Sequence, residues 1–176
     1  MLPPGANRVF FARNHDTSWF YKFGGYTPAF LNLDAIHALC TIPEVFAGDK
    51  QGNKGAENPD DRPEIWNFYR KLFKLRKILP EFTQGKLCLN GVKTDQANVF
   101  SALRIGSEKI YLILISFNEQ PTPVKIEMDT QSWAGPDVLN RYDPIREMRT
   151  PLDNLDKLIL EPYQILVIES MAINKP

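Results

Sequence analysis

A change of pattern near Pro80 constrains the fold of this sequence more than any other feature. Before it, short apolar runs alternate with segments of helical periodicity. After it, short β-prone runs follow one another without a helical period. Alternating strands and helices are typical of parallel βα units, and successive short strands are typical of an antiparallel sandwich. The sequence therefore predicts an α/β segment over residues 1–82 and an all-β domain over residues 83–176.

The first segment reads as strand, helix, strand, helix. Strands are expected over residues 8–12 and 45–47, and helices over residues 28–40 and 61–79, the first of them opening at a proline. Parallel strands need cover on both faces, and two strands are too few for a stable sheet. We therefore expect residues outside this chain, upstream or in a partner, to complete the segment.

The second segment contains short runs rich in β-branched and apolar residues, separated by turn clusters. The predicted strands cover residues 99–105, 110–117, 123–128, 138–140, 157–160 and 164–169. The absence of helical periodicity between them favours antiparallel strands in a sandwich.

Composition excludes several classes of partner. Apolar residues make up 43% and charged residues 24%, which is an ordinary globular balance. Lys plus Arg equals Asp plus Glu at 21 each, so no net charge recruits nucleic acid or an anionic membrane. No apolar run approaches the roughly 20 residues that span a bilayer. The N-terminus lacks the pattern of a signal peptide, so a cytoplasmic location is expected if Met1 is the true start.

Metal and cofactor sites are not expected. The two cysteines, Cys40 and Cys88, lie in apolar settings where a buried free thiol is the commoner outcome, and a single disulfide between them is the alternative. Their spacing matches no metal motif, and the chain has only two histidines to assist them.

Polar residues follow each predicted strand of the first segment. Asn14, His15 and Asp16 follow the first strand, and Asp49 follows the second. In a parallel barrel the carboxyl ends of the strands deliver the catalytic groups, and neighbouring strands lie about 4.8 Å apart. A turn capped by Asp16, and a carboxylate of Asp49 that only holds its own turn, are the structural alternatives; for Asp49 we favour that alternative.

These residues resemble a conserved region of the α-amylase superfamily, glycoside hydrolase family 13. Residues 10–16 are similar to its fourth conserved region, a strand that ends in Asn-His-Asp. The resemblance continues in order through the family's seventh helix, eighth strand, eighth helix and closing sandwich strands. The matching segments are residues 35–43, 45–52, 68–76, 137–139, 158–160 and 162–168.

The resemblance implies a fold: the last two βα units of a (β/α)8 TIM barrel, followed by a C-terminal antiparallel β-sandwich. It also implies a glycosidase of carbohydrate metabolism that hydrolyses α-glucosidic bonds of starch-like oligosaccharides by a retaining mechanism. Asp16 would stabilise the transition state, His15 would contact the same sugar, and Asn14 would help to hold the turn. Trp19 and Tyr21 follow the motif and would offer aromatic faces to sugar rings or pack beneath their loop.

The nucleophile and the acid/base belong, in this family, to barrel strands upstream of anything in this chain. We therefore expect the isolated chain to be inactive and to depend on the missing N-terminal barrel portion. Arg141-Tyr142-Asp143 has the spacing of the nucleophile motif, but we interpret it as a turn inside the sandwich. A subunit of a split enzyme and a non-catalytic carbohydrate-binding or interaction module are the alternatives.

Overall fold

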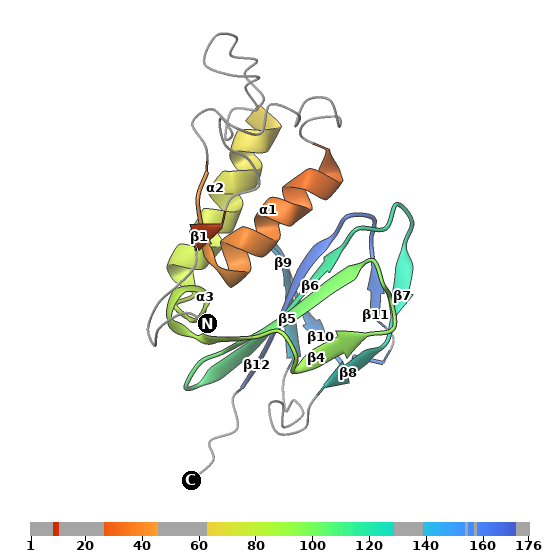
Figure 1. Cartoon of the computed structure of the whole chain (residues 1–176). Coiled ribbons are helices and arrows are strands. Elements are labelled where there is room, and N and C mark those ends of the chain that lie inside the picture. Colours follow the sequence, from red (N-terminus) through yellow and green to blue (C-terminus); the bar gives the residue numbers. More distant parts are fainter. Residues whose placement is uncertain are drawn as a thin grey trace.

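The computed structural model of the chain describes residues 9–10, 27–45, 63–128, 139–153, 155–156 and 158–171 (Figure 1). Its first part contains β1 (Val9–Phe10), α1 (Pro28–Cys40), β2 (Ile42–Pro43), α2 (Pro63–Ile78) and α3 (Glu81–Gln84). Its second part contains β3 (Lys86–Cys88), β4 (Val92–Thr94), β5 (Val99–Ile105), β6 (Lys109–Ser116), β7 (Thr122–Val124), β8 (Ile126–Met128), β9 (Leu139–Asp143), β10 (Met148–Leu152), β11 (Leu158–Leu160) and β12 (Ile165–Met171).

Helix α1 has the bounds that the sequence predicts, and both of its ends have local causes. Thr27 caps the N-terminus, because its Oγ1 accepts the N–H of Phe30 at 3.2 Å, and Pro28 occupies the first turn. At the other end Thr41 adopts an extended conformation, and both its N–H and its hydroxyl donate to the carbonyl of His37. The helix therefore stops at Cys40 and the chain extends at once.

Strands β1 and β2 pair in parallel on either side of α1 in the sequence. Val9 pairs with Ile42 and Phe10 with Pro43, and the N–H of Glu44 donates to the carbonyl of Phe10 at 2.8 Å. The second strand was predicted over residues 45–47, of which only Val45 is described, and the described strand β2 lies earlier, at Ile42–Pro43. The extended chain after Thr41 meets β1 immediately, and Val45 lies beyond the paired residues.

Helix α2 is amphipathic, and its buried residues recur every three or four positions. Its buried side is formed by Ile65, Phe68, Tyr69, Leu72 and Leu75. The helix ends at Ile78, just before Pro80, close to the predicted end at residue 79. The short helix α3, one further turn after Pro80, was not predicted.

The strand prediction was accurate where the apolar runs are long. β5 has the predicted bounds, and β6 and β12 lie within a residue or two of theirs. The predicted strand over residues 123–128 is interrupted at Lys125 and forms β7 and β8, and β9 extends three residues beyond its predicted end. β3, β4 and β10 were missed.

The second part forms a six-stranded sheet with the order β10-β9-β12-β6-β5-β3, in which every pair of neighbours is antiparallel. The pairs β11-β7 and β4-β8 lie on one face of this sheet and the three helices lie on the other, as Figure 1 shows. The chain is thus β-rich after Pro80.

Alternation along the central strand β6 supplies both faces of the sheet with apolar side chains. Tyr111, Ile113 and Ile115 pack with α1, α2 and α3, whereas Leu112 and Leu114 pack against the smaller strand pairs. The helix-side core contains Ala35 and Leu39 of α1, Leu72 and Leu75 of α2, Phe82 of α3, and Ala102 and Val167 of the sheet. One continuous core therefore connects residues on both sides of the predicted domain boundary.

Candidate functional site

The catalytic and substrate-binding residues that the sequence predicts lie outside the described residues. They are Asn14, His15, Asp16, Trp19, Tyr21 and Asp49. The structure describes the elements that lead into them. β1 ends at Phe10, shortly before the Asn-His-Asp motif, and β2 ends at Pro43, shortly before Asp49. Because β1 and β2 are parallel, their carboxyl ends lie at the same edge of the pair.

Helix α1 packs directly against β1. The rings of Phe10 and His37 stack with their centroids 5.7 Å apart. The Nδ1 atom of His37 is buried and has no hydrogen-bond partner in the described part of the chain. Burial lowers the pKa of His37, so the neutral imidazole is favoured at this contact.

The opposite side of α1 is fastened to the sheet by Asn32. This buried side chain donates from Nδ2 to the carbonyl of Ser116 at 2.7 Å and to the carbonyl of Tyr163 at 3.0 Å. Ser116 ends β6, and Tyr163 lies in the turn between β11 and β12. A single amide thus satisfies two backbone carbonyls, one at the end of β6 and one in the turn after β11.

Two arginines hold the C-terminal end of α1. Arg76 donates from Nη1 to the carbonyls of Ala38 and Phe82 at 2.8 and 2.9 Å. Arg104 donates from Nε to the carbonyl of Leu39 at 3.0 Å and from Nη1 to that of Gly85 at 2.9 Å. Positive charge is favourable at this end of a helix, where the last carbonyls lack partners within the helix.

Burial lowers the pKa of both arginine side chains. A guanidinium nevertheless stays protonated in proteins. Between them lies Cys40, whose thiol pKa burial raises to about 12, in opposition to the two positive charges nearby. Cys40 is a free, neutral thiol, and so the cluster is a structural joint between α1, α2, α3 and β5.

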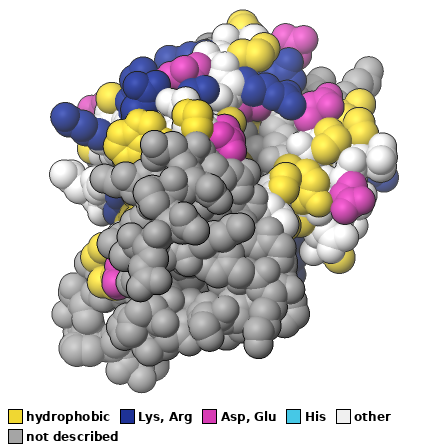
Figure 2. Space-filling view, turned by 90° about the horizontal axis from the view of Figure 1, so that it is seen from above, with side chains coloured by type: hydrophobic (Ala, Val, Ile, Leu, Met, Phe, Trp, Pro, Cys, Tyr) yellow, Lys and Arg dark blue, Asp and Glu magenta, His cyan; other side chains and the backbone are white. Residues whose placement is uncertain are grey.

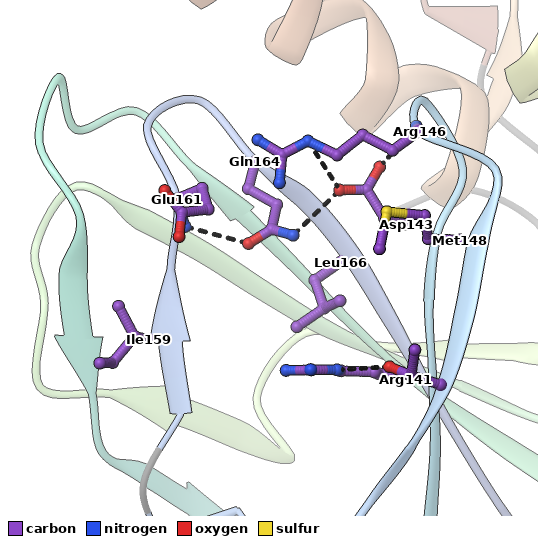
Figure 3. A pocket seen from close by; sticks show the side chains of 9 residues that line it. Arg141, Asp143, Arg146, Met148, Ile159, Glu161, Gln164 and Leu166 are labelled. Carbon is purple, nitrogen blue, oxygen red and sulfur yellow. Dashed lines mark hydrogen bonds and ion pairs between the residues drawn. The ribbon is translucent and has the colours of Figure 1, made fainter.

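Arg141, Tyr142 and Asp143 form the last three residues of β9, so the interpretation of the triplet as a turn was wrong. The turn follows over residues 144–147 and is held by Asp143 (Figure 3). The Oδ1 atom of Asp143 accepts hydrogen bonds from the N–H groups of Ile145 and Arg146 at 3.1 and 2.9 Å. Its Oδ2 atom accepts a hydrogen bond from Nε2 of Gln164 at 2.9 Å. The carboxylate is buried and occupied by these bonds, which indicates a turn-capping role.

The described residues contain no cluster of three or more His, Cys, Asp and Glu side chains that could hold a metal ion. Within the same ranges, no helix has the length and hydropathy to span a membrane. Figure 2 shows one face of the molecule, on which hydrophobic side chains lie among basic and acidic ones around the area that is not described.

Apolar side chains are exposed on the first part of the chain. Val9, Phe10 and Ile42 are 54%, 36% and 42% exposed on the strand pair. The two long helices expose Leu33, Trp66, Phe73 and Ile78. Among the described strands, β1 and β2 pair only with each other, so each leaves one edge without a described neighbour.

No protein-family model matches the sequence. Neopullulanase 2 of Thermoactinomyces vulgaris is 25% identical over 175 residues, which cover 88% of this chain and 28% of that protein. A solved maltogenic α-amylase of Thermotoga neapolitana matches with a TM-score of 0.76 at 18% identity, over 96% of this chain and 42% of that one. The α-amylase of Geobacillus thermoleovorans, solved with acarbose, gives 0.69 at 17% identity, over 95% and 39%.

The chain therefore spans less than half the length of each of these relatives. At these identities the solved structures establish a shared fold, which extends over nearly all of this chain.

Proposed function

We propose that this chain, which is similar in sequence and fold to a C-terminal portion of α-amylase-family glycoside hydrolases, supplies part of the active site of such an enzyme. The complete enzyme would cleave α-glucosidic bonds of starch-like oligosaccharides with retention of configuration. One observation carries the proposal: β1 and β2 are parallel, and Asp16 and Asp49 follow their carboxyl ends. That arrangement fits two neighbouring strands of a barrel whose strand ends form the site.

In this proposal β1 and β2 are the seventh and eighth barrel strands, α1 and α2 are the helices that follow them, and the strands from β3 onward form the C-terminal sandwich. The order of elements and the cover of α1 and α2 by the sheet support the assignment. Helix α1 is fixed from three directions, by the Phe10–His37 stack, by Asn32 and by the two arginines at its end.

Asp16 would stabilise the oxocarbenium-like transition state, because a fixed carboxylate in a water-poor cleft favours developing positive charge. His15 and Asn14 would position the same sugar through hydrogen bonds. Trp19 and Tyr21 would lie against sugar faces, and Asp49 would hold the turn after β2. These roles follow from the match of the motif to the family pattern.

The nucleophile and the acid/base would come from barrel strands outside this chain. In a retaining glycosidase their carboxyl groups lie about 5–5.5 Å apart, so both must belong to one assembled barrel. The edges of β1 and β2 that have no neighbour among the described strands, and the exposed side chains of Val9, Phe10 and Ile42, support docking of further βα units on this part. Burial of these side chains would contribute favourably to the assembly.

The first test is turnover of a chromogenic maltooligosaccharide by the purified chain, measured beside Asp16→Asn. We expect no turnover by either protein, because the two displacing carboxylates are absent. Turnover that disappears in Asp16→Asn would show that this chain, alone or self-assembled, supplies its own nucleophile and acid, and the proposal of an incomplete site would be withdrawn.

A further inference from the structure

A polar pocket of about 160 Å³ lies in the second part of the chain, on the sheet face opposite the helices (Figure 3). The register of β9 and β10 places the pocket on this face. Tyr142 packs in the helix-side core, so its neighbours Arg141 and Asp143 face the other way, together with their cross-strand partners Thr150 and Met148. Leu166, which belongs to the strand-side core, forms the floor. The pocket is therefore separate from the strand ends that lead to Asp16.

The backbone around this pocket is fixed by a buried network. Asp143 is 6% exposed and binds the turn after β9 through Oδ1, and its Oδ2 binds the side chain of Gln164. The Oε1 atom of Gln164 in turn accepts the N–H of Glu161 at 3.0 Å. The network joins the β9–β10 turn to the β11–β12 turn and fixes the two sides of the pocket before a ligand arrives.

Three charged groups at the rim keep hydrogen-bonding capacity. Arg141 binds Thr150 through Nε at 2.7 Å, and its terminal nitrogens have no partner in the described residues. Arg146 lies 3.7 Å from Asp143 through Nε, which likewise leaves its terminal nitrogens for a ligand. The exposed carboxylate of Glu161 provides an acceptor on the opposite side, since the hydrogen bonds of Glu161 within the described residues use its backbone N–H and carbonyl.

The charges decide the class of ligand. Two guanidinium groups, of Arg141 and Arg146, and two carboxylates, of Asp143 and Glu161, line the pocket, so its formal charges balance and favour neither an anion nor a cation. A neutral ligand with hydroxyl groups can accept from the arginines and donate to Glu161. The volume is comparable to a cavity of about 150 Å³ that holds one benzene ring. The apolar surfaces of Leu166, Met148 and Ile159 suit the C–H face of a pyranose.

From this geometry we infer that the pocket binds one pyranose unit of a neutral oligosaccharide. The choice of an α-glucan as the sugar rests on the proposed function. Such a site would hold a glucan chain on the sheet of the second part while another stretch of the chain reaches the strand ends.

The test is a titration of the isotope-labelled full chain with maltotriose at millimolar concentrations, followed by nuclear magnetic resonance. We expect shift changes confined to the residues of the pocket, and binding about tenfold weaker in Arg141→Ala. Arg149→Ala is the matched control, because Arg149 precedes Thr150 in β10 but its side chain lies on the helix side, bonded to Glu169. That variant should bind maltotriose like the unaltered chain.

Glu161→Gln separates sugar from anion binding and, being exposed and isosteric, leaves the fold intact. This substitution should weaken maltotriose binding a few-fold. If the unaltered chain binds inorganic phosphate instead of maltotriose, and Glu161→Gln binds that phosphate more tightly, the inference is overturned. The inference would also be overturned if maltotriose does not bind, or if Arg141→Ala leaves the affinity for maltotriose unchanged. Binding lost instead in Asp16→Asn would place the sugar at the strand ends, which contradicts this inference and leaves the proposed function standing.

Discussion

The guanidinium of Arg104 donates from Nε to the carbonyl oxygen of Leu39 at 3.0 Å, and this bond joins β5 of the sheet to the last turn of α1. Arg104 is 6% exposed, and the described residues place no carboxylate in an ion pair with it. Its charge is instead compensated by carbonyl groups, those of Leu39 and Gly85. This contact is one of several that hold α1 on the sheet, beside those of Asn32 and Arg76.

Replacement of Arg104 by Met should lower the free energy of unfolding by about 2–4 kcal/mol, because one buried and one partly buried carbonyl lose a charged donor. Urea denaturation of the full chain measures this difference. Arg70→Met on the exposed side of α2 is the control and should change stability by less than about 0.5 kcal/mol. Equal effects of the two substitutions would contradict the role given to Arg104.

Asn32→Leu should loosen α1 from the sheet, because the carbonyls of Ser116 and Tyr163 lose their shared donor. We expect a loss of about 1–3 kcal/mol and faster hydrogen exchange of the amides of α1. Asn90→Leu, at an exposed position before β4, serves as the control. If exchange in α1 stays as slow in Asn32→Leu as in the control, Asn32 does not anchor the helix.

Cys40 should be unreactive toward iodoacetamide in the folded chain, because burial raises its thiol pKa to about 12 and the thiolate is the nucleophile. Labelling at pH 8, read by mass spectrometry of the Cys40 peptide, should proceed only after unfolding. The raised pKa of Cys40 also makes the free energy of unfolding depend on pH. The folded pKa lies above the unfolded value of 9.0, so stability is retained below pH 9 and falls as the pH rises toward 12. Rapid labelling of Cys40 under native conditions would show that its thiol is accessible in the folded chain, which contradicts this account.

His37 should make the chain less stable in mild acid. Burial lowers its folded pKa below the ordinary value of 6.5, so the unfolded chain binds the proton more readily. Stability due to the neutral imidazole is present above pH 6.5 and is lost as the pH falls through the lowered pKa. Denaturation between pH 7.5 and 5 should show a steeper loss in the parent than in His37→Gln. Parallel curves for the two proteins would exclude this account.

Local signals in the sequence predict the helices well. Pro28 and Thr41 bound α1, and Pro80 stops α2, because the conformational preferences of these residues act within a single turn. The longest strands are predicted for a similar reason. β6 contains the continuous apolar run of residues 110–115 and β5 is mostly apolar, and burial on both faces favours such runs.

The remaining features depend on partners distant in sequence. β2 is set by its pairing with Val9 and Phe10, although residues 45–47 have the stronger β pattern. β10 was missed because it is an edge strand with Pro151 and polar residues, which suit an edge and carry little strand signal. Asn32 and Arg104 are visible as polar residues inside apolar runs, yet the carbonyls that they bind cannot be identified from the sequence.

The central claim is that Asp16 serves an active site whose other carboxylates lie outside this chain. The most direct measurement is hydrolysis of a chromogenic maltooligosaccharide by a chimera in which this chain replaces the matched portion of the Thermoactinomyces vulgaris neopullulanase, with that enzyme as the positive control. The chimera should be active, and Asp16→Asn should lower kcat by about 10²–10³ with unchanged cooperative unfolding, as expected for loss of one electrostatic stabiliser. A folded chimera whose activity survives Asp16→Asn would contradict the account.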